Sequence, residues 1–265
     1  MLNENQLSTQ DCHAVLVEAK DRFLACLDAL SEEDPATLDS SDNQIVLYYL
    51  EAVLVLGHMQ RPSVVENMTV SEWLSRFKEL SPEKGHPRWV IAVKEHKTAA
   101  TQLASFALSQ EQEQWFDIYY RRSRPVFQRA GRKRKRGEDI EDVEDPKDLF
   151  FLSSTGKGVH RTTNDIARLQ KKFNVPAVSS KVVRRVFETS TKDMSDSAKT
   201  LVAGYLTHSN AVTEQHYRYP TPGQPVKGIH ILKGMVPSTT SSSGDETSVG
   251  TWFLCKPQAS FQSNL

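Results

Sequence analysis

Two stretches in the C-terminal half decide the fold of this chain: Ser180-Lys-Val-Val-Arg-Arg-Val-Phe-Glu-Thr189 and Tyr205-Leu-Thr-His-Ser-Asn-Ala-Val-Thr-Glu-Gln-His-Tyr217. The first is predicted to be helical and carries Lys181 and Arg184 three positions apart. In the second, Tyr217 lies nine residues beyond His208. Lysine, histidine and tyrosine side chains can transfer protons, and a tyrosine hydroxyl can act as a nucleophile.

Upstream of these stretches, the sequence predicts a buried helix and a β-hairpin. The apolar run from Ile45 to Leu56 is nearly unbroken and stops before the turn Gln60-Arg61-Pro62. Short apolar runs at 89–93 and 103–108 flank a polar stretch, which is typical of an antiparallel hairpin with Lys97 near its turn.

The remaining apolar periodicity predicts a mainly helical domain. An S-x-x-D capping pattern at Ser8 and Asp11 precedes a helix that is expected to end near Pro35. Further helices are predicted at 64–77, 110–122, 164–173, 180–191 and 198–206. The fold class is therefore α+β, mainly helical with a small antiparallel hairpin sheet.

The order of these motifs resembles the catalytic domain of the tyrosine recombinase (phage integrase) superfamily over roughly residues 40 to 219. Lys181-x-x-Arg184 fits that family's [His/Lys]-x-x-Arg box, and Leu206-Thr-His208-Ser fits its L-G-H-S-like turn. Tyr217 occupies the place of the nucleophilic tyrosine. Arg61, after the hydrophobic helix, and Lys97, in the hairpin, take the places of the upstream arginine and the hairpin lysine.

The resemblance implies cleavage and rejoining of double-stranded DNA through a 3′-phosphotyrosyl intermediate, without metal, nucleotide or other cofactor. Arginine forks suit the non-bridging phosphate oxygens and offset charge in the transition state. A lysine protonates the leaving 5′ oxygen, and His208 donates a hydrogen bond or moves a proton. The setting suggested is a transposable element of the Crypton type. The alternative is a domesticated nuclear DNA-binding or chromatin protein that keeps the fold without catalysis.

The sequence departs from the family at several positions, and each residue also has an ordinary interpretation. Met59-Gln-Arg61 replaces the usual Gly-Leu-Arg, and Thr207 replaces a glycine. Considered alone, Arg61 would be interpreted as a surface charge and Lys97 as a solubilising residue in a turn. His208 would be interpreted as a helix cap, and Tyr217 as an amphipathic packing residue. Only about 40 residues precede the catalytic-like part, so we expect the family's core-binding clamp to be missing or to come from a partner polypeptide. A homo-oligomer on DNA is a separate expectation.

Charge is segregated between residues 121 and 146. Residues 121–136 carry nine Lys or Arg and no acid, and 138–145 carry six acids and no base, which predicts a solvated loop. Its compact basic run is Arg129, Arg132, Lys133, Arg134, Lys135 and Arg136. This run resembles a nuclear import signal and could also contact DNA phosphates, so the nucleus is the expected location.

The composition argues against a disulfide-rich protein, a zinc site and a membrane span, and its charges are unevenly distributed along the chain. The 265 residues carry 33 basic and 33 acidic side chains, yet residues 1–40 have two basic and nine acidic ones and 150–219 have eleven and five. Three scattered cysteines predict neither a disulfide framework nor a zinc site, and no apolar run is long enough to span a membrane.

The expected organisation is an acidic helical segment (1–40), the catalytic-like domain (41–220) and a Pro/Ser/Thr-rich tail (221–265) that is expected to be mostly disordered.

Overall fold

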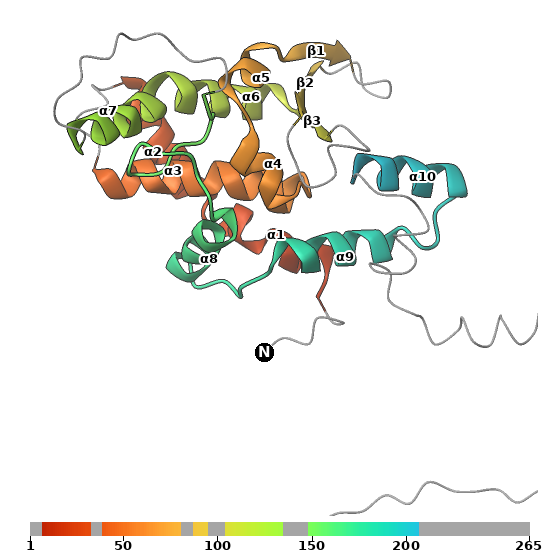
Figure 1. Cartoon of the computed structure of the whole chain (residues 1–265). Helices are drawn as coiled ribbons and strands as arrows, with labels where there is room; N and C mark the ends of the chain where they lie inside the picture. Colours follow the sequence, from red (N-terminus) through yellow and green to blue (C-terminus); the bar gives the residue numbers. More distant parts are fainter. Residues whose placement is uncertain (1–6, 33–38, 81–86, 95–103, 135–147, 207–265) are drawn as a thin grey trace, which may run out of the picture. The chain divides into compact units, whose positions relative to one another are not determined.

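The computed structural model describes residues 7–32, 39–80, 87–94, 104–134 and 148–206. Helices form most of this part of the chain, and its strands form one small sheet (Figure 1). The helices are α1 (Thr9–Glu18), α2 (Lys20–Glu32), α3 (Ser40–Ala52), α4 (Pro62–Asn67), α5 (Val70–Leu74), α6 (Gln110–Ile118), α7 (Arg124–Arg134), α8 (Thr162–Lys172), α9 (Ser180–Ser190) and α10 (Asp196–Tyr205), with π-helical turns η2 (Val53–Gly57) and η3 (Tyr119–Ser123). The predicted α+β class is confirmed.

The N-terminal segment forms two helices rather than the single one predicted. The capping box at Ser8 and Asp11 is present, with each side chain bonding the backbone N–H of the other residue. The first helix ends at Ala19, which is fully buried, and α2 begins directly after it. This break lets Val15 and Phe23 both enter the core that α3 also builds. Periodicity alone does not reveal a break that keeps the apolar side chains in phase.

The predicted buried helix is confirmed as α3 continued by η2. Its residues from Ile45 to Leu56 are buried except the half-buried Tyr48, and α3 packs against α2 and α8. Figure 1 shows α3 running beneath α2, with α8 and α9 on its other side. A helix that is apolar on nearly every side must be surrounded, which makes α3 the centre of the fold.

The predicted hairpin is confirmed and gains a third strand. Strand β2 (Pro87–Val93) pairs antiparallel with β3 (Ala104–Leu108), Ile91 lying opposite Phe106. Strand β1 (Phe77–Leu80) pairs with β2 at the sheet edge. The predicted single helix from Val64 to Phe77 is therefore wrong: α4 and α5 are separated by the non-helical Met68 and Thr69, and helix ends at Leu74. All four β1 side chains are exposed, which leaves no pattern of burial for the sequence to show. Lys97 lies outside the described residues.

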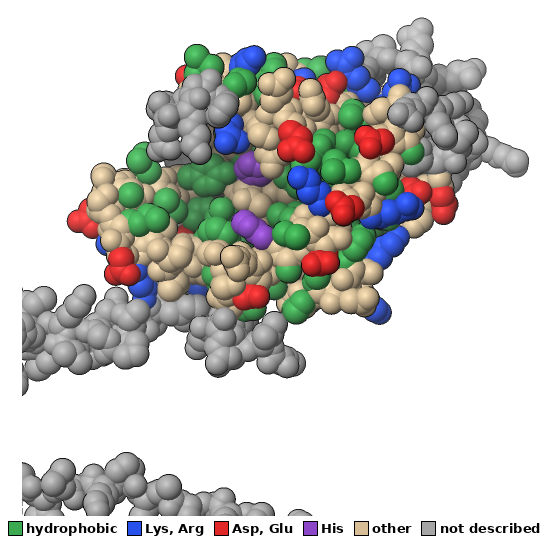
Figure 2. Space-filling view, turned by 180° about the vertical axis from the view of Figure 1, so that it is seen from behind, with side chains coloured by type: hydrophobic (Ala, Val, Ile, Leu, Met, Phe, Trp, Pro, Cys, Tyr) green, Lys and Arg blue, Asp and Glu red, His purple; other side chains and the backbone are tan. Residues whose placement is uncertain are grey.

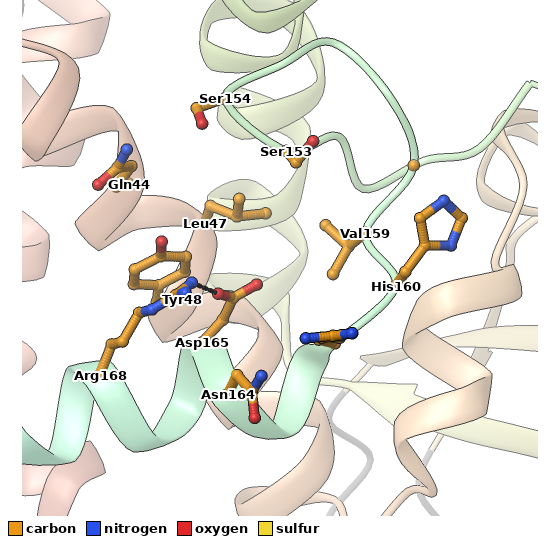
Figure 3. A pocket seen from close by; sticks show the side chains of 12 residues that line it. Gln44, Leu47, Tyr48, Ser153, Ser154, Val159, His160, Asn164, Asp165 and Arg168 are labelled. Atoms are coloured by element: carbon orange, nitrogen blue, oxygen red, sulfur yellow. Dashed lines mark hydrogen bonds and ion pairs between the residues drawn. The ribbon is translucent and has the colours of Figure 1, made fainter.

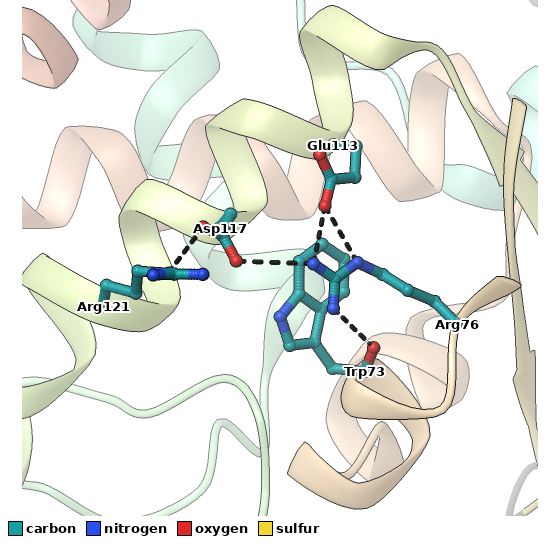
Figure 4. Close-up of polar contacts among 5 residues, drawn as sticks. All are labelled: Trp73, Arg76, Glu113, Asp117 and Arg121. Carbon is teal, nitrogen blue, oxygen red and sulfur yellow. Dashed lines mark hydrogen bonds and ion pairs between the residues drawn. The ribbon is translucent and has the colours of Figure 1, made fainter. Parts of the chain in front are cut away.

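Arg76 fastens the start of the sheet to α6 (Figure 4). Its Nη2 and Nε donate to Glu113 Oε1 at 2.6 and 2.9 Å, and its guanidinium lies 3.9 Å from the Trp73 ring centroid. Asp117, which also accepts from Arg76, pairs with Arg121 one turn further along. The charge network therefore fixes the direction in which the chain leaves α5 and enters β1.

The basic segment after residue 121 is not the solvated loop that was predicted, at least as far as Arg134. It continues α6 through η3 into α7, and Arg124 and Phe127 are buried. Arg124 Nη2 donates to Asp148 Oδ2 at 2.6 Å, and its Nε donates to the Phe150 carbonyl at 3.2 Å. The helix forms because these two side chains anchor it to the returning chain. The import interpretation of the run stays a prediction, and residues 135–147 lie outside the description.

A glycine pair brings α7 against the turn at residues 155–156. A Cβ on Gly131 would stand 2.9 Å from the Thr155 carbonyl oxygen, and one on Gly156 would stand 2.6 Å from the Phe127 carbonyl oxygen. Gly156 also has a φ of +72°, a conformation that side chains disfavour. Both backbones can approach this closely only because neither residue has a side chain.

We predict that Gly156→Ala lowers the free energy of unfolding by about 2 to 3 kcal/mol, through backbone strain and the clash with Phe127. Gly204→Ala is the matched control, because a Cβ at that helical position of α10 meets nothing within 4 Å. It should stabilise the protein by up to about 1 kcal/mol. Urea unfolding measures both changes, and equal effects would contradict the close approach.

Candidate functional site

The turn from Gly57 to Arg61 is held by hydrogen bonds from its backbone and side chains. It follows η2, and its Gln60 N–H donates to the Leu54 carbonyl at 2.9 Å. The Gln60 side chain, 2% exposed, donates to the His58 carbonyl at 3.2 Å. Arg61 then caps α4 as its N-cap residue, with Pro62 in the first helical turn. The turn therefore fixes the backbone from which the Arg61 side chain projects.

Met59 takes an unusual conformation within this turn. Its φ is +54°, in the left-handed region that glycine adopts without cost. A side chain there costs on the order of 1 to 2 kcal/mol. Met59 therefore takes a conformation in this turn that a glycine would adopt without strain. The hydrogen bonds around the turn offset the strain.

Arg184 joins three segments that are far apart in the sequence. Its Nη1 donates to the Met59 carbonyl at 3.2 Å, and its Nη2 donates to the Leu206 carbonyl at 2.5 Å. The arginine itself comes from α9 and is 4% exposed. Its planar fork thus links α9 to the turn before Arg61 and to the end of α10, two residues before His208.

Tyr205 makes a second connection between α10 and the same turn. Its hydroxyl donates to the His58 carbonyl at 3.1 Å. Burial raises the pKa of Tyr205, while a hydrogen bond with Gln60 opposes the rise. The carbonyls of His58 and Met59 therefore receive donors from two helices that lie more than a hundred residues further along the chain.

The structure places three of the six predicted catalytic residues. The Arg61 side chain is half-buried at the start of α4, and Lys181 is exposed in the first turn of α9. Arg184 is buried one turn later and contacts the backbone near Arg61. Lys97, His208 and Tyr217 lie outside the described residues. Their assignment stays a prediction.

Two other tyrosines that could compete with Tyr217 are poor candidates for the nucleophile. Tyr119 is fully buried, and its hydroxyl accepts from the Leu152 N–H at 3.0 Å. Desolvation raises its pKa far above the ordinary value, which disfavours the phenolate. Burial also raises the pKa of Tyr205, and its hydroxyl donates to the His58 carbonyl. Both act as packing residues with one satisfied hydroxyl.

A buried carboxyl group on α3 is absent from the residues that the sequence predicted. Glu51 on α3 is fully buried, and neither carboxylate oxygen has a hydrogen-bond partner in the described structure. Desolvation raises its pKa well above 4.5, and the nearby carboxylates of Asp165 and Glu66 raise it further. Glu66 accepts from the Thr162 N–H at 3.2 Å, joining α4 to α8. Only its position inside an apolar run could have signalled Glu51.

The charged surface is mixed on the face that Figure 2 shows. Lysine and arginine side chains lie among acidic ones there rather than in one continuous patch. Within the described ranges, no group of three or more His, Cys, Asp or Glu side chains is placed to hold a metal ion. No helix in that same part of the chain is long and apolar enough to cross a membrane.

Comparison with solved structures finds a recombinase among the matches. The crystal structure of XerA recombinase aligns with a TM-score of 0.42 and 16% sequence identity. The alignment covers 81% of this chain and 62% of the XerA chain, so this chain spans less than two thirds of that protein. No protein-family model and no curated protein matches the sequence. The similarity assigns no role to any residue.

We predict that Arg184→Gln lowers the free energy of unfolding by about 2 to 4 kcal/mol. The substitution removes a charged donor from two buried carbonyl contacts. Lys181→Gln, on the same helix but exposed, should change it by less than about 0.5 kcal/mol. Thermal and urea unfolding of both variants test the difference, and an Arg184→Gln protein as stable as the parent would show that the bridge contributes little.

We predict that Glu51→Gln stabilises the protein at pH 7 and has little effect near pH 4. The folded-state pKa of Glu51 lies above its unfolded value, so the wild type loses stability as the pH rises above about 4.5, by roughly 1.4 kcal/mol per pH unit until the folded pKa is reached. The glutamine variant is free of this loss. Unfolding measured between pH 4 and 8 checks it, with the exposed Glu79→Gln as control. A gain independent of pH would contradict the assignment.

Proposed function

We propose that this protein cleaves and rejoins double-stranded DNA through a covalent link between Tyr217 and a 3′ phosphate. One observation carries the proposal: the guanidinium of Arg184 bonds the backbone beside Arg61 and the backbone beside His208. These carbonyls belong to Met59, two residues before Arg61, and to Leu206, two residues before His208, and both support the proposal that the motifs form one site. Such convergence is what a composite phosphate site requires.

In this proposal Arg61 and Arg184 hold the non-bridging oxygens of the scissile phosphate. The guanidinium of Arg184 donates to the carbonyls of Met59 and Leu206, which holds its planar fork in one orientation. The arginine pair would favour the Tyr217 phenolate and offset charge in the transition state. Lys97 would protonate the leaving 5′ oxygen, with Lys181 and His208 contributing further hydrogen bonds.

A non-catalytic nuclear DNA-binding protein is the second candidate, and the burial of Arg184 favours it. At 4% exposure, the guanidinium contacts backbone on two sides and has little open surface. A protein that had given up strand cleavage would keep Arg184 for this structural contact alone. Under this reading the chain binds duplex DNA, as a single copy, an oligomer or with a partner, and forms no adduct.

We predict that the protein forms a covalent adduct with a nicked suicide duplex and that Tyr217→Phe abolishes it. Only one hydroxyl is lost, so the variant should bind the same duplex within about twofold of the parent. Denaturing gel electrophoresis detects the adduct, and it should persist in excess chelator because arginines take the place of metal ions.

The control for this experiment is Tyr205→Phe, which removes a hydroxyl donated to the His58 carbonyl. It should still form the adduct. An adduct that survives in Tyr217→Phe would overturn the choice of nucleophile, and a duplex that binds without any adduct in the parent would favour the non-catalytic candidate.

A further inference from the structure

A polar groove lies between α3 and α8, on residues that the proposed catalysis does not use. Two adjoining cavities of about 260 and 420 Å³ share Gln44, Tyr48, Ser154 and Arg168 among their lining residues. In Figure 3, Asp165 and Arg168 on α8 lie beside Tyr48 on α3, and Ser153 and His160 come from the loop before α8. The dimensions are those of a small-molecule pocket.

The groove has an excess of positive charge. Its fixed charges are Arg161, Arg168 and Lys172 against a single acid, Asp165. Arg168 Nη1 lies 2.5 Å from Asp165 Oδ1 and neutralises that carboxylate. Within the described part of the chain, neither Arg161 nor Lys172 has an acidic group at ion-pair distance. Two cations thus remain for an anionic ligand.

The other lining groups complement an anion with several oxygen atoms. Lys172 Nζ lies 3.2 Å from Ser41 Oγ, which points this ammonium group across the gap from α8 to α3. Ser153 and Ser154 line the loop side, and the half-buried Tyr48 lines both cavities. Hydroxyl donors with separated cations suit a phosphate better than a single carboxylate.

We propose that this groove binds phosphate groups, and that duplex DNA supplies them as backbone phosphates. The groove would then be a second contact with DNA, separate from the residues around Arg184. The proposal that DNA supplies the phosphates rests on the proposed function, whereas the proposal that the groove binds phosphate does not. Inorganic phosphate or a nucleoside monophosphate is the other source of the same chemistry.

The test compares two double variants of the full chain. Arg161→Gln with Lys172→Gln removes the two uncompensated groove cations; Arg161 makes no side-chain cap bond to α8, so folding should be preserved. Lys157→Gln with Lys171→Gln is the control, because both lysines are exposed, lie on the same loop and helix, and line neither cavity. Both pairs carry Tyr217→Phe, so that cleavage does not disturb the binding measurement.

We predict that the groove pair reduces the slope of log K against log salt for duplex DNA by about 1.8, or 0.9 for each lost phosphate contact. The control pair should leave the slope within about 0.3 of the Tyr217→Phe parent. Equal slopes in the two pairs would overturn DNA as the source. A second arm titrates inorganic phosphate and deoxyadenosine monophosphate, and their affinity should fall at least fivefold in the groove pair only.

The outcomes separate this inference from the proposed function. If the wild-type protein forms no covalent adduct but the groove pair loses salt slope, the catalytic proposal fails and the groove stands. If the Tyr217→Phe parent binds no duplex, the phosphate titration decides, and an affinity that the groove pair alone loses assigns the groove to a small phosphate ester. If neither DNA nor phosphate distinguishes the two pairs, the groove is not a phosphate site.

Discussion

The turn between η2 and α4 has backbone carbonyls that need hydrogen-bond donors, and the surrounding helices supply them. A chain that leaves a π-helical turn through a left-handed residue exposes carbonyls that no helical ladder can reach, and burying them unpaired would cost roughly 1 to 3 kcal/mol each. Arg184 supplies a donor to the Met59 carbonyl, and Tyr205 together with Gln60 supplies donors to the His58 carbonyl. These bonds connect α9 and α10 to the N-terminal half.

The sequence was sufficient where burial is periodic or continuous. The apolar run of α3, the β2–β3 hairpin, the capping box at Ser8 and the amphipathic α9 all follow from patterns that local physics enforces. It failed where tertiary contact overrides local character. Strand β1 has no buried side chain, and α7 looks like a solvated basic segment until Arg124 is seen to bond the chain at Asp148 and Phe150.

The candidate site was predictable only in part, for the same reason. The order of the motifs predicted Arg61 and Arg184 as site residues. It could not show that Arg184 donates to carbonyls on two other segments, because hydrogen bonds across 125 and 22 residues leave no local pattern in the sequence. Glu51 was hidden inside an apolar run, and the groove beside Tyr48 draws its lining from α3, the loop before α8, and α8. Sites assembled from distant elements become visible only when the elements are placed.

The contacts of α7 with Asp148 and with the turn at residue 156 fix where the chain returns after residue 147. Arg124 with Asp148, and Gly131 with Gly156, hold both ends of the segment 135–147 at fixed points. These contacts join α7 to Asp148 and to the turn at residues 155–156 directly, without the help of any residue from 135 to 147.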